Sequence, residues 1–496
     1  MSTTLGLELC DAGFLTAACE TLEPRILEIA DGNGATDWPG FVYHEGANYT
    51  FGRAAEDMWF VHPRRVAHTF WSKLAHEPST LTVAGKPPSF SELAFFFLRE
   101  FTQRLAATAG PLEKMVLAVP GSYLKDSASE EEKIGLLLGM ADELKLPLAG
   151  IVDLACAALC DPRSPGFNFT VPVVVVDVQL DGTDLTLFAA DERLERKHFL
   201  HLPASGSAHL LKHLTATMGN RFLRHTAFDI LEDGRIEQTF FRQTKDFLLS
   251  HAAEHRYQIN TASRNYEMPA KHDQLTADSQ DFVTKLVQGL LAFIDQTAHT
   301  PALCTVALTT RSAALPGLDV KLRAAGFVRR LRLQPGAAAC GAAYIGANRL
   351  RVPADVAEVP VECSVPLTDT RRLSAAAWEA RLQKARAHRE PLPSPTHAIV
   401  DGIGHGLVGS GRFIIGGAGT QADLTLPDSF PATDDCAVPL LREGGRLWMV
   451  DATATRFGSE AEPRVAIEAG DRLTIRCGPA SAEILFVHCA NSAKSR

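Results

Sequence analysis

The sequence has no excess of basic residues and no long apolar run. Lys and Arg together number 49 against 58 Asp and Glu, and the formal net charge is −9. A domain that binds nucleic acid usually carries a basic stripe, and the basic stretch at 329–332 is too short to form one. The apolar runs are shorter than the roughly 20 residues that a helix needs to cross a bilayer. We therefore expect neither nucleic acid nor a membrane among the partners.

Closely paired cysteines and a secretory signal are also missing. The ten cysteines are scattered, and none forms a Cys-x-x-Cys pair. Cys156 and Cys160 could form a ligand pair on a helix, but buried small apolar residues are the simpler interpretation. Residues 1–13 lack a basic stretch followed by an apolar core, so we expect no signal peptide. Scattered cysteines in this number suggest a reducing compartment, and the predicted location is cytoplasmic.

The chain does contain a strongly predicted strand that ends in a carboxylate. Residues 173–176 are four consecutive valines, as expected of a strand with both faces buried, and Asp177 follows them. A turn at 179–182 and a second apolar run to Phe188 complete a hairpin. Because α/β folds bind ligands at the ends of such strands, Asp177 is a candidate site residue. It can equally serve only to cap the turn.

Helices and strands alternate over the first 350 residues, which predicts an α/β fold. Ser89-x-x-Glu92 and Ser127-x-x-Glu130 resemble capping boxes and predict helix starts. The Ala/Gly-rich stretch 337–347 predicts a closely packed helix. The other elements that we expect are strands at 115–119, 149–153 and 304–308, a mostly helical stretch at 54–75 with a break at 62–63, and a mainly helical region at 220–300 that encloses a β segment at 256–268.

The composition changes after residue 350. Residues 351–395 are predicted to be a linker that contains a polar helix at 371–390 and ends in a stiff, proline-rich segment. Residues 396–496 show short apolar runs separated by glycine-rich turns. This spacing is typical of an all-β sandwich of about a hundred residues.

Seven stretches of the first 350 residues form a colinear series. They are GLEL at 6–9, YTFGRAAEDMWFVHPRRVAHTFWSKL at 49–74, VLAVPGSY at 116–123, IVDLACAAL at 151–159, DVQLDGTDLT at 177–186, LTTRSAALP at 308–316 and CGAA at 340–343. In this order they resemble the nucleotide-binding domain of the 70-kilodalton heat-shock chaperones, a branch of the actin-like ATPases. The resemblance implies two lobes, at about 1–170 and about 171–350, with a mostly helical subdomain at about 220–300.

The resemblance also implies a site. In the family, ATP and magnesium lie in the cleft between the lobes, where glycine-rich loops approach the phosphates. Carried over to this sequence, the nucleotide-binding positions are Glu8, Cys10, Asp11, Asp181, Gly182, Thr183, Thr309 and Thr310. Glu8 and Asp177 would hold magnesium through water, and the catalytic positions are Asp177, Asp153 and Lys73, with Ser72 as the alternative to Lys73. Glu8 can also simply face solvent, and Lys73 can belong to a solvated helix face.

The sequence departs from the family at both phosphate loops. Asp11 and Asp181 place carboxylates where the phosphates would lie, and Gln179-Leu180 replaces part of a glycine run. Two like charges about 4 Å apart cost on the order of 4 kcal/mol at an effective dielectric near 20. That is a loss of about three decades in affinity.

Residues 396–496 resemble a forkhead-associated domain. The match is carried by RFIIGG at 412–417, ADLTLPD at 422–428, WMVD at 448–451 and EAGDRLTI at 468–475. Such domains bind phosphothreonine peptides, which makes Arg412 a candidate phosphopeptide residue, although it can be an exposed strand charge. Gly417 stands where the family has an arginine, and Asp434 and Asp435 would repel a phosphate.

Three functions follow from these observations. The leading hypothesis is a protein-interaction scaffold or regulator with eroded phosphate loops, a pseudo-ATPase with weak or absent activity. The alternative is an active ATPase that binds ATP, ADP and magnesium and is coupled to a β-sandwich that binds a protein partner. The third is a phosphopeptide-binding module.

Overall fold

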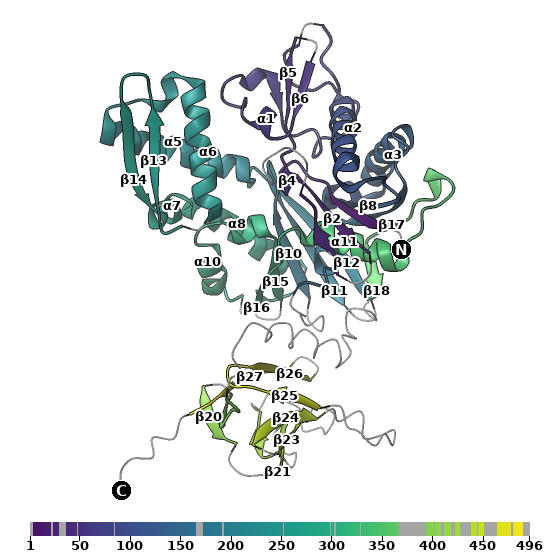
Figure 1. The fold of residues 1–496 in the computed structure, drawn as a ribbon, viewed down its shortest axis with the longest axis vertical. Helices are drawn as coiled ribbons and strands as arrows, with labels where there is room; N and C mark the ends of the chain where they lie inside the picture. Colours follow the sequence, from purple (N-terminus) through teal and green to yellow (C-terminus); the bar gives the residue numbers. More distant parts are fainter. Residues whose placement is uncertain are drawn as a thin grey trace. The chain divides into compact units, whose positions relative to one another are not determined.

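The chain is a mixed α/β protein that divides into two units, Met1–Leu367 and Thr368–Arg496, described separately below (Figure 1). The computed structural model describes residues 3–20, 23–28, 36–46, 48–83, 85–164, 172–190, 193–250, 252–297, 299–301, 304–327, 329–366, 393–400, 402–407, 411–417, 422–426, 438–443, 445–450, 464–477 and 480–489. The helix predicted at 371–390 lies outside the described residues.

Unit 1 contains two large sheets. The first has the order β17-β9-β8-β1-β2-β3, with β4 paired to β2, and the second has the order β16-β15-β10-β11-β12-β18. The strands of the first sheet are β1 Thr4–Glu8, β2 Phe14–Cys19, β3 Arg25–Ile26, β4 Asp37–Trp38, β8 Lys114–Val119, β9 Leu148–Asp153 and β17 Val361–Glu362. Those of the second are β10 Val173–Val178, β11 Gly182–Ala190, β12 Arg193–Pro203, β15 Thr305–Leu308, β16 Arg329–Arg332 and β18 Ser364–Pro366. Residues up to Pro366, the first part of the stretch expected to be a linker, therefore pair with unit 1.

The two sheets repeat one topology. In the first, β1 runs antiparallel to β2 and parallel to β8. In the second, β10 runs antiparallel to β11 and parallel to β15. Strands β1 and β10 therefore hold equivalent central places, and each carries a carboxylate near its end, Glu8 in β1 and Asp177 in β10.

Helices α4 (Leu154–Leu159) and α11 (Ala337–Arg349) join the two sheets. One apolar cluster contains both helices together with inward-facing residues of β8 and β9 on one side and of β10 and β11 on the other. The contacts are very close, because a Cβ added at Gly341 would lie 1.7 Å from the carbonyl oxygen of Ala157, and one added at Gly6 would lie 2.1 Å from that of Ala339. The close packing predicted for the Ala/Gly-rich stretch is confirmed.

The first sheet is covered by α2 (Phe90–Ala109) and α3 (Ser127–Glu143), and a small sheet, β5 (Val42–Glu45), β6 (Asn48–Phe51) and β7 (Val66–Ala67), lies nearby with α1 (Arg53–Glu56) (Figure 1). The capping box at Ser89 and Glu92 is confirmed. The one at Ser127 is wrong, since Asp126 is the N-cap residue and accepts a hydrogen bond from the backbone of Ser129. The mostly helical stretch predicted at 54–75 is also wrong.

That stretch contains only the end of α1 and a short 3₁₀ turn, Pro63–Arg65. Pro63, where the break was expected, lacks an N–H group and cannot continue a helix. The residues after the turn pair with β5 as β7 instead of forming a second helical segment. Tertiary pairing therefore overrides the local helix propensity of this region.

The part of unit 1 between β12 and β15 is mainly helical around a β-hairpin, as predicted. Figure 1 shows the hairpin beside α5 and α6, and an apolar core joins them to the second sheet. The helices are α5 Ser207–Thr226, α6 Gly234–Ser250, α7 His272–Asp278 and α8 Gln280–Gln296, followed after β15 by α9 Thr310–Ala313 and α10 Leu318–Ala324; the hairpin strands are β13 Glu254–Asn260 and β14 Asn265–Lys271.

In unit 2 the described elements are strands, arranged in two sheets of order β20-β19-β27-β26 and β22-β21-β23-β24-β25. Both sheets contribute side chains to one apolar cluster, which includes Val400 and Ile484 from the first sheet and Ile415 and Leu440 from the second. The strands are β19 His397–Val400, β20 Ile403–Gly406, β21 Gly411–Gly416, β22 Leu424–Thr425, β23 Val438–Glu443, β24 Arg446–Val450, β25 Arg464–Ile467, β26 Arg472–Cys477 and β27 Ala480–Val487.

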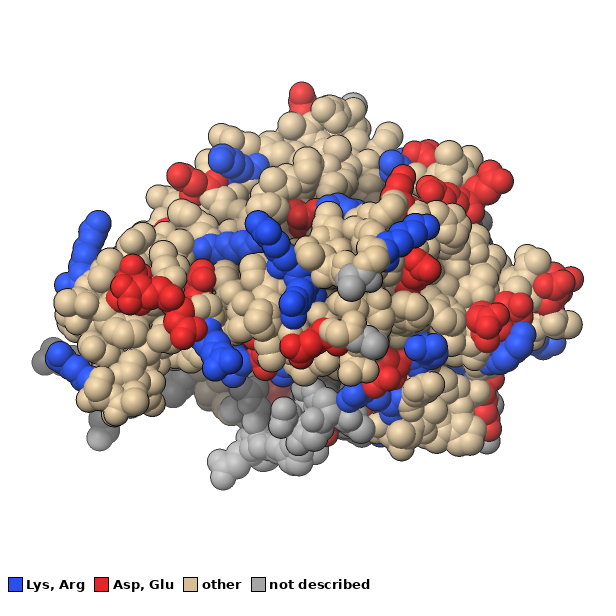
Figure 2. All heavy atoms as spheres, turned by 90° about the horizontal axis from the view of Figure 1, so that it is seen from above, with Lys and Arg blue, Asp and Glu red and all other residues tan. Residues whose placement is uncertain are grey.

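Within the described ranges, no helix combines the length and apolar composition that crossing a membrane requires. On the face drawn in Figure 2, Lys and Arg side chains are interspersed with Asp and Glu side chains.

Candidate functional site

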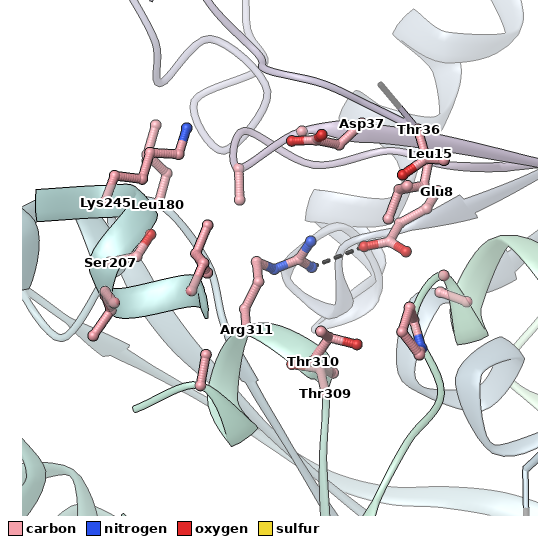
Figure 3. A pocket seen from close by; sticks show the side chains of 18 of the residues that line it. Glu8, Leu15, Thr36, Asp37, Leu180, Ser207, Lys245, Thr309, Thr310 and Arg311 are labelled. Carbon is pink, nitrogen blue, oxygen red and sulfur yellow. Dashed lines mark hydrogen bonds and ion pairs between the residues drawn. The ribbon is translucent and has the colours of Figure 1, made fainter. Parts of the chain in front are cut away.

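The candidate site lies where β1 and β10 end, and Arg311 bridges the two strands. Arg311 belongs to α9, which follows β15, and its Nη2 atom lies 2.8 Å from Oε1 of Glu8 and 3.2 Å from Oδ1 of Asp177. Its Nε donates to the carbonyl oxygen of Val178 at 3.2 Å. Figure 3 shows the guanidinium pointing at Glu8. One cation of the chain is thus shared by the carboxylates at the equivalent ends of both sheets.

Asp177 has hydrogen-bond partners at both carboxylate oxygens. The hydroxyl of Thr309 donates to Oδ1 at 2.9 Å, beside Arg311, and the side-chain amide of Gln179 donates to Oδ2. Gln179 comes from the turn that was predicted to form a phosphate loop, and Thr309 from the predicted nucleotide-binding positions. Both side chains instead hold Asp177 in place.

The charges at this point are buried. Burial raises the pKa of Glu8, while Arg311 opposes the shift. Burial alone would lower the pKa of Arg311, but the neighbouring Cys10, Asp177 and Glu8 raise it well above its usual value. Burial raises the pKa of Cys10 to about 12, and its thiol donates to the carbonyl oxygen of Gly13 at 3.1 Å. Cys10 is therefore a neutral thiol at neutral pH, and Arg311 keeps its charge.

A second arginine pairs across the two sheets. Arg196 of β12 places Nη1 2.8 Å from Oδ2 of Asp153 and donates through Nη2 to the carbonyl oxygen of Gly121 at 2.9 Å. The side chains of Asp153 and Arg196 are 0% and 8% exposed. Asp153 is also the N-cap of α4, where Oδ1 accepts from the backbone of Cys156. Its pKa is raised by burial, against the opposing effect of Arg196.

Asp11, predicted to face a phosphate, binds the backbone of its own chain. Its two carboxylate oxygens accept from the amides of Trp71 and Ser72, each at 2.9 Å. Burial raises its pKa to about 6, against the lowering effect of these hydrogen bonds. Lys73 is exposed and forms no ion pair with the site carboxylates in the described part of the chain, so the predicted catalytic lysine is not brought to Asp153 or Asp177.

The second predicted phosphate loop is also used internally. A Cβ added at Gly182 would lie 2.4 Å from the ring of His201 and 2.7 Å from the carbonyl oxygen of Leu202, so this glycine is needed for packing within the sheet. The hydroxyl of Thr183 is buried and donates to the carbonyl oxygen of Ser205 at 2.6 Å. Asp181 lines a recess of about 20 Å³ together with Asp11. A space of this size holds about one water molecule.

These residues do not fit a magnesium nucleotide. The guanidinium of Arg311 lies between the two carboxylates that would hold the metal through water. Asp11 and Asp181 place further carboxylates around one recess, at the positions where the resemblance implies phosphates. Among the described residues there is no group of three or more His, Cys, Asp or Glu side chains arranged to hold a metal ion.

A cavity of about 310 Å³ adjoins Arg311 (Figure 3). Glu8, Thr309 and Thr310 lie in its wall, but most of the lining is aliphatic or aromatic. Its walls come from strands of the first sheet, from the segments that follow β10, β15 and β16, and from α6 and the starts of α5 and α11. Small-molecule sites of proteins are usually concave and mainly apolar in this way.

Sequence reasoning missed Arg311 and Arg196. Arg311 could have been noticed, because it follows the two threonines at the end of a strand predicted to reach the cleft. Arg196 gave no such signal, since its neighbours Glu195 and Lys197 make β12 look solvated. The predicted phosphopeptide residue Arg412 belongs to β21, and its side chain lies outside the described part of the structure.

No family model matches the chain, and a search of curated proteins also returned no match.

Proposed function

We propose that unit 1 is a two-lobed, actin-like domain of the heat-shock chaperone type that serves as a protein-interaction scaffold without needing ATP. Each large sheet would form the centre of one lobe. The repeated strand order of the two sheets supports this assignment, because each places one strand between an antiparallel and a parallel neighbour.

The observation that carries the proposal is the bridge from Arg311 to Glu8 and Asp177. In an ATP-dependent relative a metal and its nucleotide would draw the two lobes together. Here an arginine of the chain supplies the cation, so the lobes are held without a ligand. A scaffold requires this property, since its binding surface must persist when nucleotide levels change.

The test is equilibrium binding of Mg-ATP and Mg-ADP to the full chain, measured by isothermal titration calorimetry and by thermal unfolding. We expect no heat of binding and no shift of the melting temperature with either nucleotide, and no change when EDTA is added. Saturable binding of one Mg-ATP per chain that is lost in Asp177→Ala would contradict the proposal. It would favour the alternative, an active ATPase.

For unit 2 we propose a divergent forkhead-associated sandwich that contributes a protein-binding surface. Two sheets with a common apolar core support this reading. We also propose that the full chain binds protein partners and that it acts in the cytoplasm. Pull-downs with the full chain would identify these protein partners. A phosphothreonine peptide library would test whether unit 2 binds phosphopeptides through Arg412.

A further inference from the structure

We propose that the cavity beside Arg311 binds one uncharged, mainly apolar small molecule, about the size of two or three aromatic rings. The inference goes beyond the proposed scaffold function, which requires no ligand. It rests on the chemistry of the lining, on the pairing of its charges and on its size.

The lining is apolar on several sides. Aromatic and aliphatic side chains from the first sheet, from the segment around α1 and from α5, α6 and the α9–α10 region face one space. They include Leu15, Phe41, Trp59, Leu211, Phe241 and Leu315. Removing apolar surface from water contributes about 25 cal/mol per Å², so such a wall favours an apolar ligand.

The charged side chains of the lining are already paired. The lining holds three carboxylates and two cations, and the third carboxylate pairs with Arg53 outside the lining, so no unpaired cation remains in the wall to bind a polyphosphate. An uncharged ligand leaves every pair intact, whereas a charged one must compete with them at the cost of desolvation. The pairs are Glu8–Arg311, Glu56–Lys245 and Asp37–Arg53.

The size and the opening of the cavity agree with a small ligand. An apolar cavity of about 150 Å³ is enough to bind benzene. This cavity of about 310 Å³ is twice as large. Leu249, which lines it, is 50% exposed, so the cavity reaches solvent there. The hydroxyls of Thr310 and Ser207 lie in the wall and can bond to a polar end of the ligand.

The probe for the test is N-phenyl-1-naphthylamine, a neutral dye whose fluorescence rises in apolar surroundings. It is titrated into the full chain and into two variants that fill the cavity, Leu249→Trp from its exposed edge and Ala314→Trp from its wall. We expect one site per chain and at least tenfold weaker binding in both variants. Mg-ATP in excess should not displace the dye.

The matched control is Leu231→Trp, because Leu231 is 54% exposed and does not line the cavity. It should bind the dye as the wild type does. Should Ala314→Trp fail to fold, as judged by circular dichroism, Leu249→Trp alone decides. Equal dye affinity in wild type and Leu249→Trp, absence of saturable binding, or displacement of the dye by Mg-ATP would each overturn the proposal.

Discussion

Arg311 and Glu8 are separated by 303 positions in the sequence, yet Nη2 of the arginine lies 2.8 Å from Oε1 of the glutamate. The contact joins the end of one sheet to the end of the other.

Replacing Arg311 by methionine should destabilise unit 1 by about 3 kcal/mol. This is the low end of the cost of breaking a buried ion pair, because the Arg311 side chain is 22% exposed. Urea unfolding followed by tryptophan fluorescence measures the change, since Trp38, Trp59 and Trp71 are buried in this unit.

Adding Glu8→Gln to Arg311→Met should recover part of the loss, because the double variant no longer buries an unpaired glutamate. The surface arginine Arg323 serves as the control: it pairs with Asp319 while 69% exposed, and Arg323→Met should cost less than about 0.5 kcal/mol. Equal losses of stability in Arg311→Met and Arg323→Met would contradict a stabilising bridge from Arg311 to Glu8 and Asp177.

Asp153→Asn should also destabilise unit 1 by about 3 kcal/mol, because the amide can still cap α4 but no longer neutralises the buried Arg196. Asp153→Ala should destabilise unit 1 by about 1 kcal/mol more than Asp153→Asn, because alanine also removes the N-cap hydrogen bond. The measurement is again urea unfolding. Asp126, the exposed N-cap of α3, is the matched control: Asp126→Asn should have a much smaller effect, and a comparable one would assign the loss to the charge of an N-cap carboxylate and not to the pair with Arg196.

Asp11 should make stability depend on pH between about 4 and 6. Its pKa in the folded protein is about 6, above the usual 3.8, so the folded state takes up the proton first. Protonation of Asp11 therefore stabilises the folded state. This stabilisation is complete below pH 3.8 and is lost as pH rises through 6. It amounts to at most about 3 kcal/mol, at 1.36 kcal/mol for each pKa unit.

Unfolding curves of wild type and Asp11→Asn across this pH range measure the effect. The difference in free energy of unfolding between the two proteins should change by up to about 3 kcal/mol over the range. Asp126 provides a contrast in sign, because the backbone hydrogen bond from Ser129 lowers its pKa and its contribution is instead lost as pH falls. A pH profile that Asp11→Asn leaves unchanged would contradict the prediction.

Gly341→Ala should prevent stable packing of α11 on α4, since the new Cβ would lie 1.7 Å from a backbone oxygen of Ala157. We expect a loss of more than about 3 kcal/mol or a failure to fold, seen by thermal unfolding. Gly139→Ala is the control: it lies within α3, where a Cβ would meet no atom within 4 Å. That change should stabilise the protein by about 0.5–1 kcal/mol.

Much of the fold could be predicted because its signals are local. The four consecutive valines of β10, the capping box at Ser89 and the small residues of α11 each determine their element through neighbours in sequence. The helix predicted at 54–75 failed because Val66 and Ala67 pair with β5, which local propensity does not reveal. At the second helix start, Asp126 and Ser127 are both good N-cap residues, and their order in the sequence does not decide between them.

The candidate site was predicted in part. Glu8 and Asp177 do lie close to one another, and Thr309 contacts Asp177. The identity of their cation could not be predicted, because it depends on a contact between residues about 300 positions apart. The same is true of Asp11, whose partners are two backbone amides of a distant turn.

A cation that is part of the polypeptide has a fixed local concentration. Chelators cannot extract Arg311, dilution cannot remove it, and hydrolysis of a nucleotide leaves it where it is. The pairing of this cation with Glu8 and Asp177 therefore does not depend on the supply of metal ions or nucleotide.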